Sequence, residues 1–342
     1  MTTTGHPAAP PTLEDVARVA GVSRATVSRA VRGGERVSEA ARAAVEAAIR
    51  ELDYVPNRAA RQLASRRAGT IAVVLPEPDT RVFADPFFAL TMAGVNDALR
   101  DTDVQPVLLM GGPDGGTGRI LSYLRGGHVD GVLVASHHRR DHLVEELAGG
   151  RLPAVFVGRP LRRHHHAYVV DVDNREGGRR AAAHLAERGC TRVVSIDGPP
   201  DMAASVDRAA GWRAGLEAAG LGQLGSSAGD FTARSGREAM RRLLREHPGL
   251  DGVFAASDLM AVAALDELRS AGIDVPGRVK VVGYDNHAFA EDASPPLTSV
   301  VNPARELAAR AAHVLLELAE GGSPERLTLL PCTLVERESS AR

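Results

Sequence analysis

The side chains that a predicted helix over 24–31 leaves exposed have chemistry suited to DNA. An arginine can donate two hydrogen bonds to guanine, which discriminates between bases by about 1–3 kcal/mol. Serine and threonine hydroxyls suit phosphate oxygens and fix the register of a protein on the duplex. The alternative is a surface helix that happens to be basic. The exposed set is Arg24, Ala25, Thr26, Ser28 and Arg29.

A preceding helix and a tight turn must position this face. Thr12 is a good N-cap, and Asp15 completes a capping box, so the sequence predicts a helix over 13–20. Gly21 can adopt the positive φ at which that helix stops. Ser23 then caps the next helix, so the two helices meet at a sharp angle. This order indicates a helix-turn-helix.

A third helix completes the predicted bundle. Gly33 and Gly34 break the chain, Ser38 caps the helix, and the tripeptide at 54–56 ends it. An arginine-rich segment without acids follows at 57–67, and such a segment can enter a minor groove. The positions expected to face the interior are apolar: Val16, Ala17, Ala20, Val22, Val27 and Val31.

The charge of the chain is divided unevenly. The segment 12–67 holds 11 arginines and 7 acids, a net charge of +4. The whole chain has 41 basic and 43 acidic residues, so the rest has 30 and 36, a net charge of −6. A basic head on an acidic body suits a protein that binds DNA through its head and does not bind other partners nonspecifically. Salt should weaken the DNA contact steeply.

Length and composition set the class of protein. A chain of 342 residues is too long for one ordinary core, and 44% hydrophobic residues can bury a large one. The polar tail over 1–11 has no apolar signal segment, and no run is long enough to span a bilayer, so we expect a cytoplasmic protein and no membrane partner. With Cys190 and Cys332 as the only cysteines, a disulfide framework is not expected.

From Thr70 onwards, short apolar runs alternate with helical patterns. This alternation is typical of parallel sheets covered by helices on both faces. There are too many units for one sheet, and the run YVVDVDN restarts the pattern midway. The sequence therefore predicts an α/β body of two similar doubly wound subdomains.

Polar and aromatic residues follow the predicted strands of this body. Ligands of such sheets bind outside the carboxyl ends of the strands. Hydrogen-bonding ends beside aromatic faces suit a polyol, whose hydroxyls need donors and acceptors while its C–H faces pack on rings. Taken singly, each residue type also has a purely structural explanation. An aromatic side chain can belong to the core, an arginine can lie on a solvated helix, and an aspartate can be the N-cap of a helix. The candidates are Asp85, Phe87, Phe88, Ser136, His137, Arg159, Arg208, Asp230, Phe231, Ser257, Asp258, Tyr284, Asp285 and Asn286.

The segment 12–67 resembles the DNA-binding headpiece of the lactose-repressor (LacI/GalR) family nearly position for position, and the resemblance continues to LLPCTLVERESS near the end of the chain. It implies a hinge helix over 57–65, capped by Asn57, with Leu63 as the wedge in the minor groove. The DNA contacts predicted from residues and resemblance together are Thr12, Ser23, Arg24, Ala25, Thr26, Ser28, Arg29, Arg32, Asn57, Arg58, Leu63 and Ala64.

The resemblance also implies the organisation of the chain. An all-α helix-turn-helix headpiece with its hinge helix precedes a periplasmic-binding-protein-like clamshell whose lobes the chain enters more than once. The expected parts are a disordered tail at 1–11, a DNA-binding domain at 12–56, a hinge and linker at 57–68, and an effector and dimerisation domain at 69–342. Its first subdomain would take about 69–170 and 300–327, and its second about 171–298 and 328–342.

Within this clamshell the family's effector contacts fall on Phe87, Arg208, Phe231, Asp258 and Asp285, and we add four neighbours as effector-binding candidates. Departures occur at Ala135, Gly158 and Ser257, where relatives can carry Asn, an acid and Asn. They put the identity of the ligand in doubt, and Arg159 beside Gly158 keeps a sugar phosphate open. The added candidates are Asp85, Ser136, His137 and Arg159.

Some motifs suggest chemistry that we do not expect. The glycine-rich run at 111–119 lacks phosphate-loop spacing and a Lys-Ser/Thr pair. The run RRHHH at 162–166 has adjacent residues that rarely converge on one metal ion, so we interpret it as a solvated loop. No nucleophile–base signature stands out. We therefore predict no catalytic residues, no metal site and no cofactor.

These observations predict a sequence-specific transcription regulator that acts as a repressor. It would bind a palindromic double-stranded operator as a homodimer and respond to a small sugar-like effector. The dimer follows from the absence of a coiled coil beyond 336–342. Three alternatives remain open: a sugar receptor of a transporter, a Rossmann-type enzyme, and a regulator that senses a nucleoside or a partner protein.

Overall fold

The chain divides, in the computed structural model, into two units, Met1–Ala68 and Gly69–Arg342. The predicted hinge helix over 57–65 and the first ten residues of the predicted tail lie outside the residues that the structure describes. The same is true of the predicted DNA contacts Arg32, Asn57, Arg58, Leu63 and Ala64. The described residues are 11–31, 37–54, 67–111, 116–139, 142–162 and 164–341.

The first two helices of the first unit have the predicted bounds, α1 Leu13–Ala20 and α2 Arg24–Val31. The capping box is formed: the backbone N of Asp15 donates to Thr12 Oγ1 over 3.3 Å, and the backbone N of Thr12 donates to Asp15 Oδ2 over 3.0 Å. Gly21 has a φ of 64°, which ends α1 in a left-handed turn. The local signals of the sequence therefore determine these two helices.

The third helix, α3 Glu39–Leu52, closes a small core. It begins at the predicted cap, because Ser38 Oγ accepts from the backbone N of Ala41 over 3.3 Å. It ends earlier than predicted, because Asp53 adopts a left-handed φ of 48°. Tyr54 then turns back into the core. The buried apolar side chains are Val16, Ala17, Val27, Val45, Ala48 and Tyr54.

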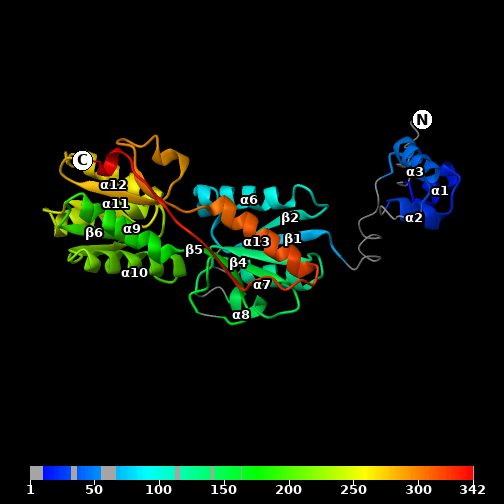
Figure 1. Cartoon of the computed structure of the whole chain (residues 1–342), viewed down its shortest axis with the longest axis horizontal. Helices are drawn as coiled ribbons and strands as arrows, with labels where there is room; N and C mark the ends of the chain where they lie inside the picture. Colours follow the sequence, from blue (N-terminus) through cyan, green and yellow to red (C-terminus); the bar gives the residue numbers. More distant parts are fainter. Residues whose placement is uncertain are drawn as a thin grey trace, which may run out of the picture. The chain divides into compact units, whose positions relative to one another are not determined.

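The first lobe of the second unit contains a sheet in the order β11-β5-β4-β3-β1-β2 with parallel pairing throughout (Figure 1). Alternate strand residues face opposite helix layers, as period-two side chains must. Ile71 and Val73 alternate with Ala72 and Val74 between two core clusters. The strands are β1 Thr70–Leu75, β2 Gln105–Met110, β3 Gly131–Ala135, β4 Ala154–Val157, β5 Tyr168–Val172 and β11 Leu327–Leu330.

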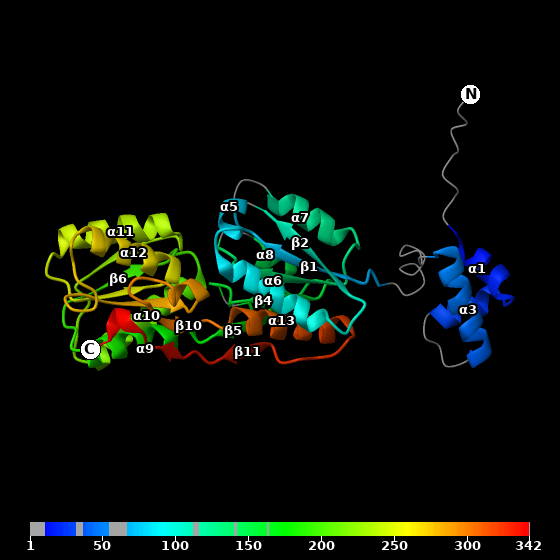
Figure 2. The same ribbon diagram turned by 90° about the horizontal axis from the view of Figure 1, so that it is seen from above.

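Two pairs of helices cover this sheet. Two long helices lie side by side on one face, and Figures 1 and 2 both show their contact. Two shorter helices cover the other face. A one-turn helix, α5 Asp79–Val82, follows β1. The long pair is α6 Pro86–Leu99 and α13 Ala304–Ala319, and the short pair is α7 Gly116–Arg125 and α8 Leu143–Leu147.

The second lobe repeats this plan with a sheet in the order β12-β10-β9-β8-β6-β7. Its pairing is parallel except at the edge, where β12 runs antiparallel to β10. The strands are β6 Val193–Asp197, β7 Gly225–Ala228, β8 Gly252–Ala255, β9 Lys280–Asp285, β10 Thr298–Val301 and β12 Leu334–Val335.

Helices again cover both faces of the second sheet. Short 3₁₀ turns follow β9 and β12. The turns are η1 Ala288–Ala290 and η2 Glu338–Ser340. On one face lie α9 Asn174–Glu187 and α10 Ala203–Ala218, and on the other α11 Ala233–Glu246 and α12 Asp258–Ser270.

The chain passes between the lobes three times, after β5, β10 and β11. The predicted subdomain limits, about 170, 298–300 and 327, fall inside these three strands and are corrected here. Each strand is completed within one sheet because its ladder continues past the predicted limit: Val172 pairs with Leu330, and Val301 pairs with Asp285. Periodicity marks a strand but does not say which sheet its last residues join.

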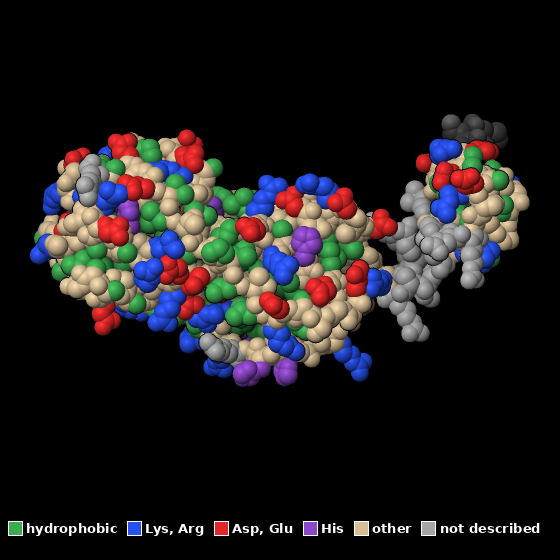
Figure 3. Space-filling model, viewed as in Figure 1, with side chains coloured by type: hydrophobic (Ala, Val, Ile, Leu, Met, Phe, Trp, Pro, Cys, Tyr) green, Lys and Arg blue, Asp and Glu red, His purple; other side chains and the backbone are tan. Residues whose placement is uncertain are grey.

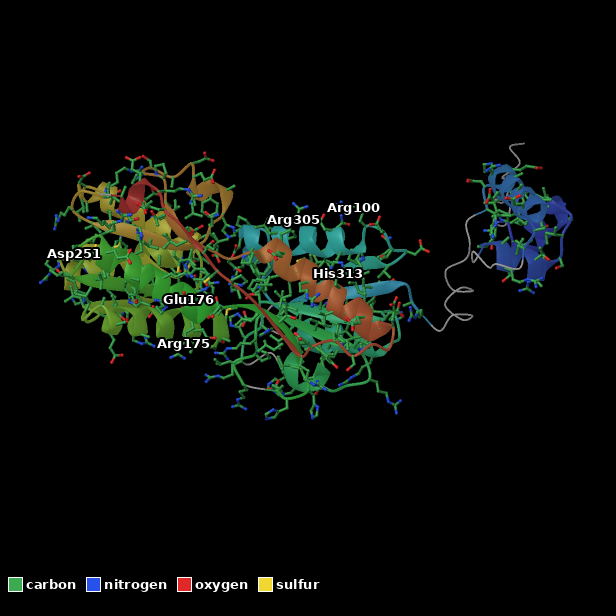
Figure 4. All side chains as sticks on the ribbon, in the orientation of Figure 1. Arg100, Arg175, Glu176, Asp251, Arg305 and His313 are labelled. Carbon is green, nitrogen blue, oxygen red and sulfur yellow. The ribbon has the colours of Figure 1, made fainter. Side chains whose placement is uncertain are left out.

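Glycines let two helix pairs approach closely. A Cβ atom added at Gly178 of α9 would lie 2.0 Å from the backbone oxygen of Arg208 in α10. In the first lobe, a Cβ at Gly94 of α6 would lie 2.0 Å from the backbone oxygen of Arg305 in α13. Arg305 Nε and Arg100 Nη2 donate to Asp97 over 2.6 and 2.7 Å, and Figure 4 labels both arginines. These contacts fix the layers behind the strand ends.

The face of the second unit that Figure 3 shows is mixed in charge. Figure 3 shows basic and acidic side chains interspersed over both lobes in that view. Within the part of the chain that the structure describes, no helix is both long enough and apolar enough to cross a membrane.

Replacing Gly178 by alanine should destabilise the second unit by about 1–3 kcal/mol, because the methyl group would overlap the α10 backbone rather than a flexible side chain. Calorimetric melting of the full chain should show the loss as a lower Tm. Gly222→Ala is the matched control, since nothing lies within 4 Å of its added Cβ. An equal Tm for Gly178→Ala and the native protein would contradict the close packing of α9 and α10.

Candidate functional site

A cavity of about 710 Å³, including the solvent at its mouth, lies where the carboxyl ends of strands from both lobes meet. The structure brings eight of the nine predicted effector residues to its wall. They are Asp85, Phe87, Ser136, His137, Arg159, Arg208, Phe231 and Asp285.

Arg208 is the buried cation of the cavity. Its guanidinium donates from Nε to Asn174 Oδ1 over 2.9 Å and from Nη1 to the backbone oxygen of Ala256 over 2.6 Å. Nη2 lies 3.4 Å from Asp285 Oδ1, and the ring centroid of Tyr284 lies 3.6 Å from Cζ. Arg208 is only 5% exposed, so these contacts are what makes a charge tolerable there.

Asp285 is held opposite Arg208 by an unusual backbone. Its φ is 109°, and Asn302 Nδ2 donates to Oδ1 over 3.1 Å. Burial raises the pKa of Asp285, while the charge of Arg208 opposes that rise. Ser136 and Phe231, which also line the cavity, have positive φ values of 59° and 66°. Sparsely populated backbone conformations of this kind tend to cluster at functional sites.

Asp258, the ninth predicted residue, is absent from the described cavity wall. Ser257 is the N-cap of α12, so Asp258 is its first helical residue, and its side chain is fully buried. Its carboxylate accepts from Ser299 Oγ over 2.6 Å and from the backbone N of His287 over 2.8 Å. Burial, with the nearby charge of Asp285, raises the pKa of Asp258 to about 7. Its direct role is therefore to hold the loop after β9.

Aromatic faces form the apolar part of the wall. Phe87 lines the cavity, whereas Phe88 is 2% exposed and belongs to the core. Phe231 receives Arg208 and Arg81 on its ring, with Cζ atoms 5.7 and 5.4 Å from the centroid. The cavity thus combines flat apolar surfaces with charged ends, which suits the two sides of a sugar ring.

His137 completes the wall as a neutral group. Its Nε2 hydrogen-bonds the backbone oxygen of Gly158 over 2.9 Å, and its ring packs edge-on against Phe156. Burial lowers the pKa of His137, so the ring is uncharged at neutral pH. His137 therefore contributes an uncharged polar side chain to the wall next to Ser136.

Sequence reasoning missed several polar residues of the cavity. Asp171 lies within β5 and accepts from the backbone N of Arg159 over 3.0 Å and from Asn174 Nδ2 over 3.2 Å. An aspartate inside the apolar run YVVDV was a signal that could have found it. Asn302, in the turn after β10, and Arg81, in α5, carried no comparable signal. The four missed residues that line the cavity are Arg81, Asp171, Asn174 and Asn302.

Each of three cavity guanidiniums has a carboxylate partner. Arg81 Nη1 lies 2.7 Å from Glu77 Oε1, Arg159 Nη2 lies 2.6 Å from Asp207 Oδ2, and Arg208 faces Asp285. A phosphate would have to compete with these pairs. The wall therefore favours a neutral ligand rich in hydroxyl groups over the sugar phosphate that remained open. Among the described residues, no cluster of three or more His, Cys, Asp or Glu could hold a metal ion.

In the first unit, α2 presents the predicted DNA-reading face. Arg24, Ala25 and Arg29 are exposed, whereas Val27 is buried in the core. Ser23 caps α2, because its Oγ accepts from the backbone N of Thr26 over 3.2 Å. Arg24 Nε lies 3.1 Å from Glu14 Oε1, and Arg29 Nε donates to the backbone oxygen of Ala25 over 3.3 Å. These exposed ion-pair and hydrogen-bond contacts are weak enough to exchange for DNA.

Thr12, Thr26 and Ser28 complete the set of predicted contacts within the described part of this unit. Thr12 is exposed beside the start of α1, and Thr26 and Ser28 are half-buried on α2. Thr12 Oγ1 donates to Asp15 Oδ2 over 2.8 Å, so its hydroxyl already serves the capping box. The hydroxyl groups of Thr12 and Thr26 therefore lie at the starts of two helices, where backbone amides suit phosphate, whereas Ser28 lies in the middle of α2.

The chain is similar to known regulators over almost its whole length. Residues 12–57 match the family model described as bacterial regulatory proteins of the lacI family, and residues 182–340 match a periplasmic binding protein-like domain. The HTH-type transcriptional regulator CelR of Thermobifida fusca is 47% identical, with 96% of this chain and 98% of CelR covered. The ribose operon repressor of Bacillus subtilis is 30% identical, with 97% and 99% covered.

Solved structures agree with this relationship. A complex of the transcriptional regulator CelR with cellobiose has 45% sequence identity and a TM-score of 0.77, over 96% of this chain and 99% of that one. The lac repressor dimer bound to operator and the anti-inducer ONPF has 28% identity and a TM-score of 0.86, over 98% and 100%. Together with the helix-turn-helix and the two-lobed cavity, these matches show that the chain belongs to the LacI family of bacterial transcription regulators.

Proposed function

We propose that this LacI-family regulator is a repressor that senses a neutral saccharide, with cellobiose as the first candidate. The observation that carries this proposal is the buried Arg208–Asp285 pair in the cavity, with the Arg208 guanidinium over the ring of Phe231. The cellobiose complex of a regulator 45% identical to this chain supports the choice of sugar. A nucleoside or partner-protein effector remains the alternative for the same cavity.

The chemistry of the wall explains how a sugar would be held. A hydroxyl group both donates and accepts, so it needs paired partners. Asp285 accepts, Arg208 donates, and Asn302 can do both. The C–H faces of a pyranose ring would pack on Phe87 and Phe231, which stand at the same cavity. Because every cavity guanidinium described above has a carboxylate partner, a neutral ligand leaves the charge balance undisturbed.

The DNA-binding part of the function rests on the headpiece. The chain is a sequence-specific DNA-binding regulator and not an enzyme or a transport receptor, as its family membership establishes. Its place of action is the cytoplasm, where the DNA lies. We propose that Arg24, Ala25 and Arg29 read bases in the major groove. The segment 57–65, outside the described residues, remains the predicted minor-groove contact, with Leu63 as its wedge.

We further propose that the protein binds a palindromic operator as a homodimer. The lac repressor, which shares this fold, is a dimer on its operator. In this chain, Leu108 and Met110 of the edge strand β2 are 37% and 39% exposed, so two large apolar side chains of this strand are open to solvent. A second copy would cover them and place two headpieces on successive half-sites.

Replacing Asp285 by asparagine should weaken cellobiose binding about 10- to 100-fold, because a hydrogen bond to a charged group contributes about 1.5–3 kcal/mol. Isothermal titration calorimetry measures this directly. Asp266→Asn, a change at a half-buried position on α12 outside the cavity wall, is the control and should bind like the native protein. Operator binding by the Asp285→Asn protein verifies that it is folded. Native sugar affinity in that variant would place the ligand elsewhere.

Replacing Arg29 by alanine should relax the preference for one base pair of the operator half-site by about 1–3 kcal/mol. Selection from randomised operators, compared with the native protein, measures this change. Arg50→Ala, on the exposed side of α3, should leave base preference unchanged. If Arg29→Ala instead weakened binding uniformly for all sequences, Arg29 would be a phosphate contact and not a base reader.

A further inference from the structure

A histidine outside the wall of the ligand cavity joins the two lobes. His138 follows β3 in the first lobe, and its ring lies between two carboxylates. Nε2 is 3.0 Å from Oε1 of Glu77, which follows β1 in the same lobe. Nδ1 is 3.0 Å from Oδ1 of Asp201, which precedes α10 in the other lobe. The backbone N of Arg139 donates to the backbone oxygen of Asp201 over 3.0 Å at the same place.

This geometry defines the protonation state of the ring. An ionised carboxylate can only accept a hydrogen bond, so both ring nitrogens of His138 must carry a proton. The histidine is therefore an imidazolium cation when the lobes are together. Its side chain is 22% exposed, and those of Glu77 and Asp201 are 3% and 27% exposed, so solvent screens the contacts only in part.

Charged and polar groups from several neighbouring segments surround His138 and its partner Glu77. Glu77 Oε1 also accepts from Ser136 Oγ over 2.6 Å and from Arg81 Nη1 over 2.7 Å. His137 next in the chain is neutral. Burial disfavours the charged ring, but the hydrogen bonds and charges of Glu77 and Asp201 outweigh it and raise the pKa of His138 to about 9.

The same hydrogen-bond network extends to the wall of the ligand cavity. Ser136 and Arg81 both line the cavity, and both donate to the carboxylate oxygen of Glu77 that faces His138. A continuous series of hydrogen bonds therefore runs from the cavity wall through Glu77 and His138 to Asp201 in the opposite lobe. Separation of the lobes would keep the contact of His138 with Glu77 and lose its contact with Asp201.

We propose that closure of the two lobes around the effector takes up a proton at His138, which then bridges Glu77 and Asp201 as a cationic latch. This inference rests on the proposed function only for the ligand that drives closure. With the lobes apart, the ring has lost one carboxylate, so its pKa lies below the value of about 9 that it has in the closed state. Effector binding is then linked to pH through a residue that need not touch the effector.

The sign of the linkage follows from these two states. Below the open-state pKa the ring is charged in both states, and the latch stabilises closure fully. As pH rises from there towards about 9, closure must take up a proton, and effector affinity falls by up to tenfold per pH unit. Above that range the ring is neutral in both states, and the contribution of the latch is lost.

A second histidine must be separated from this effect. His287 Nε2 lies 3.5 Å from Asp85 Oδ1 of the other lobe and 3.9 Å from Asp285 Oδ2. Burial lowers the pKa of His287, but these aspartates reverse the shift and raise it. Proton uptake that survives removal of His138 comes from other groups, such as His287 or Asp258, whose pKa burial raises to about 7, so the test is the difference between the native and His138→Gln proteins.

Calorimetric titration of the full-length protein with cellobiose, in buffers of different ionisation enthalpy at pH 8, counts the protons taken up. The native protein should take up a measurable fraction of one proton, and its Kd should rise from pH 7 to pH 9. His138→Gln should lose most of the uptake and flatten the pH profile. His313→Gln, an exposed change on α13 labelled in Figure 4, should behave like the native protein. Equal proton uptake by the native and His138→Gln proteins would overturn the proposal.

A second measurement does not depend on the sugar. Spin labels at Arg119→Cys of α7 and Glu217→Cys of α10 report the distance between the lobes, since the native cysteines are buried. The distance in the sugar-free protein should increase from pH 7 to pH 10, and His138→Gln should abolish this dependence. If cellobiose fails to bind, the proposed ligand is wrong and this distance alone judges the latch. A distance that ignores pH in the native protein would contradict it.

Discussion

A buried guanidinium imposes the strictest constraint on this structure. The side chain of Arg208 is shielded from solvent, and an unpaired charge in that position would destabilise the folded protein by several kcal/mol. Its partners come from three segments: Asn174 at the start of α9, the backbone of Ala256 after β8, and Asp285 at the end of β9. All three must therefore converge at one point. The tight approach of α9 and α10 at Gly178 and the left-handed backbone of Asp285 are consequences of that demand.

The same convergence creates the cavity. Two of the segments that satisfy Arg208 follow strands of the second sheet, and the third is the crossing after β5 of the first sheet, so the carboxyl ends of both sheets meet at the cavity. Polar pairs join the two sides: Arg159 with Asp207, His138 with Asp201, and His287 with Asp85. Three chain crossings allow the lobes to move while these pairs define a closed state. A ligand held between the lobes can therefore shift their equilibrium by its preference for that state.

Much of this architecture could be predicted from the sequence because its causes are local. Caps at Thr12 and Ser23 determine the first helices, and alternating apolar runs determine the sheets. Most of the predicted residues that line the cavity could be found because they lie in the segments between a strand and the next long helix, or early in that helix. Asp258 could not be placed, because its position after Ser257 says nothing of whether the side chain turns to the cavity or to Ser299. Contacts such as His138 with Asp201 join segments far apart in the chain, and no periodicity encodes them.

In the proposed function, a neutral sugar in the cavity controls the affinity of the headpiece for DNA. Coupling between two sites of this kind typically amounts to about 1–3 kcal/mol, or about 5- to 150-fold in affinity. The most direct test is fluorescence anisotropy of a labelled operator, titrated with the full-length protein with and without saturating cellobiose. The sugar should change the operator Kd by a factor in that range, in either direction. An operator Kd that stays constant while calorimetry shows the sugar to be bound would contradict it.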